Sequence, residues 1–140
     1  MNGGTLDISS TNDAIECESG YISINGGNLI LNSSEGDAIK TSYKGTDTSI
    51  VPDITVTGGS INISISGQAS KGLNAKGNIT ISGETIKVVS TGNAYYDTEE
   101  ADTSSSAGIK AKENMTISSN AIITINSSGK GGKGINVDGT

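Results

Sequence analysis

A motif of two glycines followed by alternating apolar and polar residues recurs along the chain. It appears as GGTLDIS at residues 3–9, GGNLILN at 26–32 and GGSINIS at 58–64. A weaker copy, GETIKV, begins at Gly83, and a copy without glycines, NAIITI, begins at Asn120. Because a recurring internal unit is the sequence signature of stacked repeat architectures, this feature constrains the fold more than any other.

Two further motifs follow each copy in constant order. The second is a small residue followed by an apolar residue, at Ile15, Ile39, Leu73, Ile109 and Ile135. The third alternates apolar and polar residues and closes the first four units, at residues 22–24, 54–56, 79–81 and 115–117. Alternation with period two, bounded by Gly, Asn, Ser and Asp, predicts short strands and tight turns.

A unit of about 24 residues cannot bury a core of its own, so the units must stack. Parallel pairing of equivalent strands, about 4.8 Å apart, creates inward columns of Ile, Leu and Val. The columns are Leu6, Leu29, Ile61, Ile86 and Ile123; Ile8, Leu31, Ile63, Val88 and Ile125; and Ile15, Ile39, Leu73, Ile109 and Ile135. The sequence thus predicts an all-β right-handed parallel β-helix, or β-solenoid, of about five turns with three short strands per turn; right-handed crossovers are the strongly favoured hand.

We expect one solenoid domain over residues 1–140, as an excerpt of a longer solenoid. The distance between successive copies is 23 residues for the first interval and 25 for the third. It is 32 for the second and 37 for the fourth. The longer intervals predict insertions near residues 41–53 and 93–106, at the corners that flank the second strand of the repeat.

The composition excludes several classes of function. The chain has no His, no Arg and a single Cys, so Ser-His and Cys-His catalysis and zinc sites built from His or four Cys are excluded. A net charge of −6 makes nucleic acid an improbable partner. No apolar stretch approaches the roughly 20 residues of a membrane-spanning helix. Gly, Ser, Thr and Asn form about half of the chain, which the repeat explains as turns and outward-facing positions.

Residues 3–40 and the segment SSSAGIKAKENMTIS at 104–118 resemble the repeats of a known family. These are bacterial extracellular carbohydrate-binding proteins of the polygalacturonate-binding type, with a pectate-lyase-like right-handed parallel β-helix. The resemblance implies binding of an acidic plant-wall polysaccharide with the help of Ca²⁺ on the outer face. It also implies an extracellular or cell-surface location.

The same resemblance places the acidic position that precedes the small residue at Asp13 and Asp37. Stacked one turn apart, these carboxylates would lie about 5 Å from each other, with Glu16 on the outer face nearby. Together with Asp97 and Glu99 of the second insertion they are the candidate Ca²⁺ ligands, because calcium prefers six to eight oxygen ligands. The alternative is that Asp13 and Asp37 cap turns by accepting backbone N–H bonds.

Tyrosines mark the two insertions. Tyr95 and Tyr96 belong to the second insertion and Tyr43 to the first. A tyrosine ring offers flat apolar area and a polar hydroxyl, so these three are the candidate sugar-stacking residues, unless the insertions are simply solvated loops. The outer face of the second strand, between the two insertions, is the expected binding surface.

Binding without catalysis is the function that we favour from the sequence. A Ca²⁺-dependent polysaccharide lyase would need a lysine base, for which Lys40, Lys71, Lys110 and Lys133 are the candidates. None of the four lies clearly inside an acidic cluster. A further alternative is a self-assembling fibre or adhesin module, because the chain begins inside a Gly-Gly turn and ends without a polar cap. End-to-end association is therefore an additional expected partner interaction.

Overall fold

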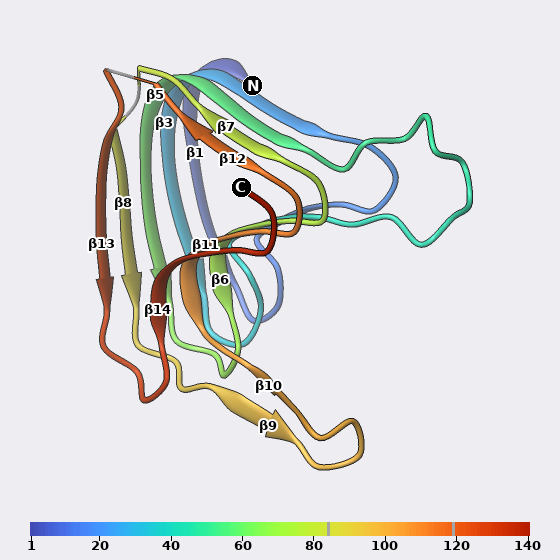
Figure 1. The fold of residues 1–140 in the computed structure, drawn as a ribbon. Coiled ribbons are helices and arrows are strands. Elements are labelled where there is room, and N and C mark those ends of the chain that lie inside the picture. The colour runs from blue at the N-terminus through green and yellow to red at the C-terminus, as the bar shows by residue number, and fades with distance from the viewer. Residues whose placement is uncertain (84, 119) are drawn as a thin grey trace.

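The computed structural model describes residues 1–83, 85–118 and 120–140 and contains only strands, turns and loops there. Two parallel sheets form the body, and one hairpin projects from it (Figure 1). The long sheet contains β1 (Asn2–Ser10), β3 (Ile22–Ser33), β5 (Ile54–Ile65), β7 (Ile79–Ile81), β8 (Thr85–Ser90), β12 (Met115–Ile117) and β13 (Ile122–Ser127). The short sheet contains β2 (Ile15–Cys17), β4 (Ile39–Thr41), β6 (Lys71–Ala75), β11 (Ala107–Ala111) and β14 (Lys133–Val137). The all-β prediction is confirmed.

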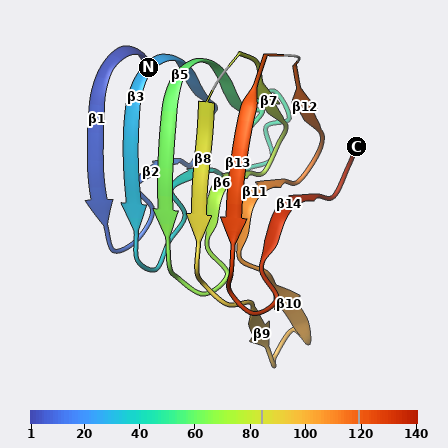
Figure 2. The same cartoon turned by 90° about the vertical axis from the view of Figure 1, so that its left-hand side faces the viewer.

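Strand pairing joins equivalent positions of successive repeats. In the long sheet Leu29 pairs with Leu6 on one side and Ile61 on the other. In the short sheet Leu73 pairs with Ile39 and Ile109. Figure 2 shows the consequence, with β1, β3, β5, β8 and β13 side by side in chain order. The predicted parallel pairing and the three predicted columns are confirmed by the register.

The sequence predicts a turn between the third strand of one repeat and the first strand of the next. In β3 and β5 these two strands are instead continuous. β3 and β5 each run for 12 residues through the Gly-Gly pair instead of ending there. Gly59 has a φ of +108°, which side chains of L-residues rarely tolerate. A Cβ atom on Gly58 would overlap the carbonyl oxygen of Asn25 on the neighbouring strand. The glycines therefore turn the strand at an irregularity where the register shifts, and regular pairing resumes beyond it. In the fourth copy, Glu84 lies outside the described residues.

The core is the set of inward columns. Leu29, Ile61, Ile86, Ile39 and Ile109 are each at most 1% exposed. Their counterparts in the outermost repeats are less protected: Leu6 and Ile123 are half-buried, and Ile135 is 45% exposed. Each of these has a stacked neighbour on one side only, so burial rises toward the middle repeats.

The two insertions fold differently. The first, after β4, contains turns but no strand. The second contains an antiparallel hairpin of β9 (Tyr95–Asp97) and β10 (Asp102–Ser104), which the sequence did not predict. No part of the described chain forms a helix of the length and apolar character required to cross a membrane.

Candidate functional site

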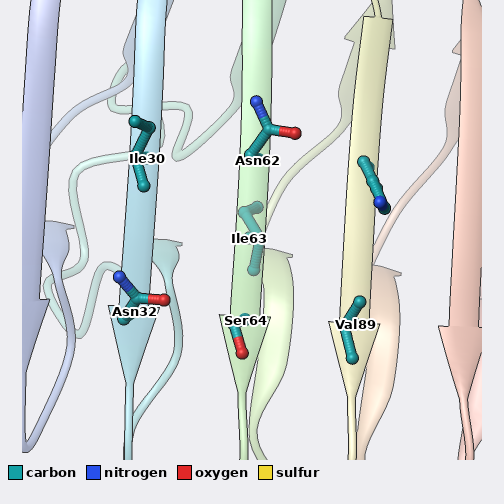
Figure 3. Close-up of a pocket in the computed structure, with 7 residues that line it drawn as sticks. Ile30, Asn32, Asn62, Ile63, Ser64 and Val89 are labelled. Carbon is teal, nitrogen blue, oxygen red and sulfur yellow. The ribbon is translucent and has the colours of Figure 1, made fainter.

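Among the depressions on the outer surface of the described residues, four have linings that differ in chemistry. The first, about 160 Å³, lies on the outer face of the long sheet (Figure 3). Its lining side chains come from three neighbouring strands, with Ile30 and Asn32 on β3, Asn62 on β5 and Val89 on β8. It is a shallow hollow of amides and aliphatic groups with one charged side chain, that of Lys87 on β8.

Most of the charged residues that the sequence proposes as calcium ligands or as lysine bases belong to the outer face of the short sheet. Its central row, one residue from each strand, is Glu16, Lys40, Asn74, Lys110 and Asn136. Because successive strands lie about 4.8 Å apart, long side chains in this row reach those of the neighbouring repeat. The charges therefore interact along the stack, and the first two repeats must be considered separately from the last three.

In the first two repeats the acidic side chains already have partners. The ammonium of Lys40 lies 2.9 Å from Asp13 Oδ2 and 2.7 Å from Glu16 Oε1. Partial burial alone would lower the pKa of Lys40, but the hydrogen bonds that its ammonium donates to Glu16 and Asp13 raise it above its ordinary value. The charges of this region are largely neutralised internally.

Asp13 and Asp37 also form a ladder that caps successive turns. The backbone N–H of Asp37 donates to Asp13 Oδ1 at 2.7 Å, and the N–H of Lys71 donates to Asp37 Oδ1 at 2.6 Å. The second oxygen of Asp37 accepts from the Asn74 amide at 2.6 Å. Burial is the largest influence on Asp37 and raises its pKa, although these hydrogen bonds oppose the shift. The turn-capping contacts considered from the sequence are present.

These contacts do not fit a calcium site. Calcium needs six to eight oxygens directed at one point. The oxygens of Asp13 and Asp37 face N–H groups, and the ammonium of Lys40 lies between Asp13 and Glu16. Within residues 1–83, 85–118 and 120–140, no three acidic or Cys side chains are grouped so as to hold a metal ion.

The other two proposed ligands lie at the tip of the hairpin. Asp97 Oδ1 accepts the N–H groups of Glu99 and Glu100 at 2.8 and 3.2 Å. This is the geometry of a capped turn. The structure therefore does not bring Asp97 and Glu99 together with Asp13, Asp37 and Glu16 into one cluster.

The last three repeats form a groove of about 440 Å³ lined by lysines, here called the lysine groove. The outer face of the short sheet is its floor and β10 with the segment after it is one wall. Its lining residues are Lys71, Asn74, Lys76, Asp102, Thr103, Ser104, Ser105, Lys110, Lys112, Lys133, Asn136 and Asp138. Five of the nine cationic side chains of the chain thus meet in one depression, although the net charge is −6.

The lysines of the groove differ in their surroundings. Lys71 is partly buried against the hairpin, and its ammonium donates to the carbonyl of Ala69 and, at 3.0 Å, to Ser104 Oγ. Burial is the largest cause that lowers its pKa below the ordinary value. Asp37 opposes that shift, whereas repulsion by nearby lysines, Lys110 foremost, adds to it. A set of lysines that repel one another is an electrostatic site for an anion.

The tyrosines are distributed over two other depressions. Tyr96 is 57% exposed and lines a hollow of about 350 Å³ with Gln68, Asn93 and Lys130. Thr103, its partner across the hairpin, lines both this hollow and the lysine groove. Tyr95 is 49% exposed on the same strand.

Tyr43 is separate from the hairpin tyrosines. It lines a depression with Glu18, Ser42 and Lys44, and its hydroxyl accepts the N–H of Asp47 at 3.0 Å. The two insertions therefore do not enclose one common groove: the second borders the lysine groove, and the first borders a depression of its own.

From the sequence, Lys71, Lys110 and Lys133 are candidate bases only, and no cationic cluster is predicted. The information was present in the repeats. Around the apolar residue of the second motif, lysines stand two before it in Lys71 and Lys133, one after it in Lys40 and Lys110, and three after it in Lys76 and Lys112, so five of these six belong to the third to fifth repeats. Stacking places these positions side by side.

Comparison with known proteins identifies a family over almost the whole chain. Residues 1–139 match the family described as carbohydrate-binding domain-containing protein. In searches of curated proteins and of solved structures, none matches the chain.

Proposed function

This chain belongs to the family of carbohydrate-binding domain-containing proteins, and we propose that it binds an acidic polysaccharide in the lysine groove without modifying it. The observation that carries the proposal is the groove itself, where Lys71, Lys76, Lys110, Lys112 and Lys133 converge in an acidic protein. Uronic acid polymers present one carboxylate per sugar, and ammonium groups bind carboxylates by charge-assisted hydrogen bonds. Polygalacturonate is the probe that the sequence resemblance suggests.

We further propose that the two sheets are faces of a right-handed parallel β-helix of the pectate-lyase-like type. The support is the parallel pairing of equivalent positions across five repeats and the strong preference of parallel crossovers for the right hand. Such proteins present long outer faces on which an extended polymer can lie across several strands. An extracellular or cell-surface location would give access to wall polysaccharides.

Tyr96 supplies a second contact for the same ligand. Its exposed ring lies on the other side of the hairpin from the groove, beside the amides of Gln68 and Asn93. Rings and amides are suited to sugar faces and hydroxyls. Thr103 lines both depressions, so a polymer that fills the groove can extend past the hairpin to Tyr96.

Calcium assistance stays a prediction of the sequence. The contacts of Asp13, Asp37 and Glu16 weigh against a site built from those residues, and lysines bind carboxylates without a metal. We therefore expect binding to persist in EDTA, whereas loss of binding in EDTA would restore the calcium proposal.

The lyase alternative has one observation in its favour. Lys71 lies in the groove with a lowered pKa, a property of lysine bases. Its ammonium is engaged by Ala69 and Ser104, however, so it would first have to leave these partners. Release of unsaturated uronate products from polygalacturonate by the purified protein would establish this activity.

End-to-end association also stays a prediction. Ile117, which closes the fourth repeat, and Ile122 and Ile135 of the fifth are 47, 62 and 45% exposed and would provide its apolar surface. Analytical ultracentrifugation over a range of concentrations tests it.

The principal experiment compares two double variants in polygalacturonate binding. Lys76→Gln with Lys133→Gln removes two groove charges for which no ion pair is found within the described residues. We expect about a ten-fold loss of affinity, measured by isothermal titration calorimetry at low ionic strength.

The matched control, Lys44→Gln with Lys87→Gln, removes the same charge from two of the other depressions. Its affinity should equal that of the unchanged protein. Equal affinities for the two double variants would contradict the proposed site.

A further inference from the structure

The lysine groove contains an acidic side chain of its own at the position where a ligand would bind. Asp138 follows β14, and its two carboxylate oxygens contact two different lysines. One oxygen accepts from the Lys110 ammonium and the other from Lys112 at 3.1 Å. The hydrogen bonds from Lys110 and Lys112 are the main cause that lowers the pKa of Asp138, so it stays ionised at neutral pH.

We propose that Asp138 is an internal competitor for the groove, which makes the protein select long acidic polysaccharides over short acidic sugars. The inference rests on the proposed function and concerns selectivity within it. The Asp138 carboxylate occupies the place between two ammonium groups that a ligand carboxylate would take. A ligand must displace it before it can use Lys110 and Lys112.

Displacement is feasible because the competitor is held weakly. The side chain of Asp138 is 38% exposed and that of Lys112 55%, whereas that of Lys110 is 16% exposed. Solvent screens the exposed pair with Lys112, so this pair holds Asp138 only weakly. The Asp138 side chain can therefore swing away without disturbing the core.

Chain length decides which ligands achieve the displacement. A short acidic sugar carries too few carboxylates to contact all the lysines of the groove at once, so losing Lys110 and Lys112 removes a large share of its binding energy. A polymer can contact Lys71, Lys76 and Lys133 first. Its next carboxylate then acts at a high effective concentration and competes successfully with the tethered Asp138.

The test measures the affinity of Asp138→Asn for galacturonic acid trimer and for polygalacturonate. Removing the competitor should raise affinity for the trimer about three- to ten-fold. For the polymer we expect a rise of about two-fold at most, because the polymer already displaces Asp138. The ratio of polymer to trimer affinity therefore falls.

Asp7→Asn is the matched control, because Asp7 is an exposed carboxylate on β1 of the long sheet. It changes the net charge equally and should leave both affinities unchanged. Asp138→Ser provides a second variant that removes the carboxylate, and melting curves confirm that each variant is folded.

Three outcomes are distinguishable. If polygalacturonate binds and groove variants weaken it, but Asp138→Asn behaves like Asp7→Asn, Asp138 is an ordinary surface ion pair and the inference is wrong. The same holds if both ligands gain equally. If the unchanged protein does not bind polygalacturonate at all, the proposed function fails first and the inference fails with it.

Discussion

The two halves of the short sheet's outer face share one backbone register but differ in electrostatics. Lys40 and Lys110 occupy equivalent positions, separated by Asn74 in the same row. Lys40 is paired with two carboxylates of its own region, Asp13 and Glu16, whereas Lys110 shares the single carboxylate of Asp138 with Lys112 in a groove that contains four other lysines. Equivalent positions in a repeat protein thus need not be equivalent in function, because each outward side chain depends on its neighbours in adjacent repeats.

The largest expected effect tests whether the two halves share one core. Leu73 is fully buried and pairs with Ile39 of the first half and Ile109 of the second. Leu73→Ala should lower the free energy of unfolding by about 2–5 kcal/mol, because it leaves a cavity between them. Urea denaturation followed by circular dichroism measures the change. The exposed Ser64→Ala serves as control and should change stability by less than about 0.5 kcal/mol.

The second prediction compares the equivalent lysines directly. Lys110→Gln should weaken binding of polygalacturonate about two- to five-fold, because it removes a charge from the groove. Lys40→Gln removes the same charge at the same register and should leave the affinity unchanged, since Lys40 does not line the groove. Calorimetric titration measures the affinity of both variants for polygalacturonate. Equal losses of affinity would contradict the proposed difference between the two halves.

The third prediction concerns Asp37, at the boundary between the halves. Its pKa is raised by burial above the ordinary 3.8, so the folded protein binds its proton more tightly than the unfolded chain does. The contribution of Asp37 to stability is therefore greatest below pH 3.8 and is lost as the pH rises through the raised value. Asp37→Asn does not titrate, so its stability relative to the unchanged protein should improve over that window and then level off.

Urea unfolding midpoints of Asp37→Asn and the unchanged protein, measured from about pH 3.5 to 7, test this sign. Hydrogen bonds lost between the new amide and Asn74 would add an offset that does not vary with pH. If Asp37→Asn instead loses stability relative to the unchanged protein as the pH rises, the raised pKa of Asp37 is contradicted.

The smallest effect is expected for the ion pairs of the first half. Glu16→Gln removes one partner of Lys40 but leaves Asp13 at 2.9 Å, and Glu16 is a surface residue. The free energy of unfolding should fall by less than about 0.5 kcal/mol. Thermal melting at low and high salt measures it. A larger loss at low salt would mean that the neutralised half contributes to stability far more than exposed pairs usually do.

Much of the fold could be predicted from the sequence because local alternation and the repeat together determine which apolar side chains point inward. Alternation places Leu29 and Leu31 on one face of a strand, and the repeat aligns them with Ile61 and Ile63. The hairpin of β9 and β10 could not be predicted in this way. It occurs once, so no repeat supports it, and its strands are three residues each.

The candidate site was predicted less well than the fold. The sequence directed attention to the outer face of the second strand and to the second insertion, both of which contribute to the lysine groove. It assigned the binding chemistry to Asp13, Asp37 and Glu16, which the structure shows engaged with N–H groups and with Lys40. Single residue types do not indicate whether a charge already has a partner.

The sequence by itself determined that this chain folds into stacked all-β repeats around columns of Ile, Leu and Val. Period-two alternation and the glycine pairs are local properties, and they fix which side chains point inward. Only the tertiary structure decided which lysines remain available to a ligand. That outcome depends on which carboxylate of a neighbouring repeat lies within hydrogen-bond distance, and on where the hairpin packs against the sheet.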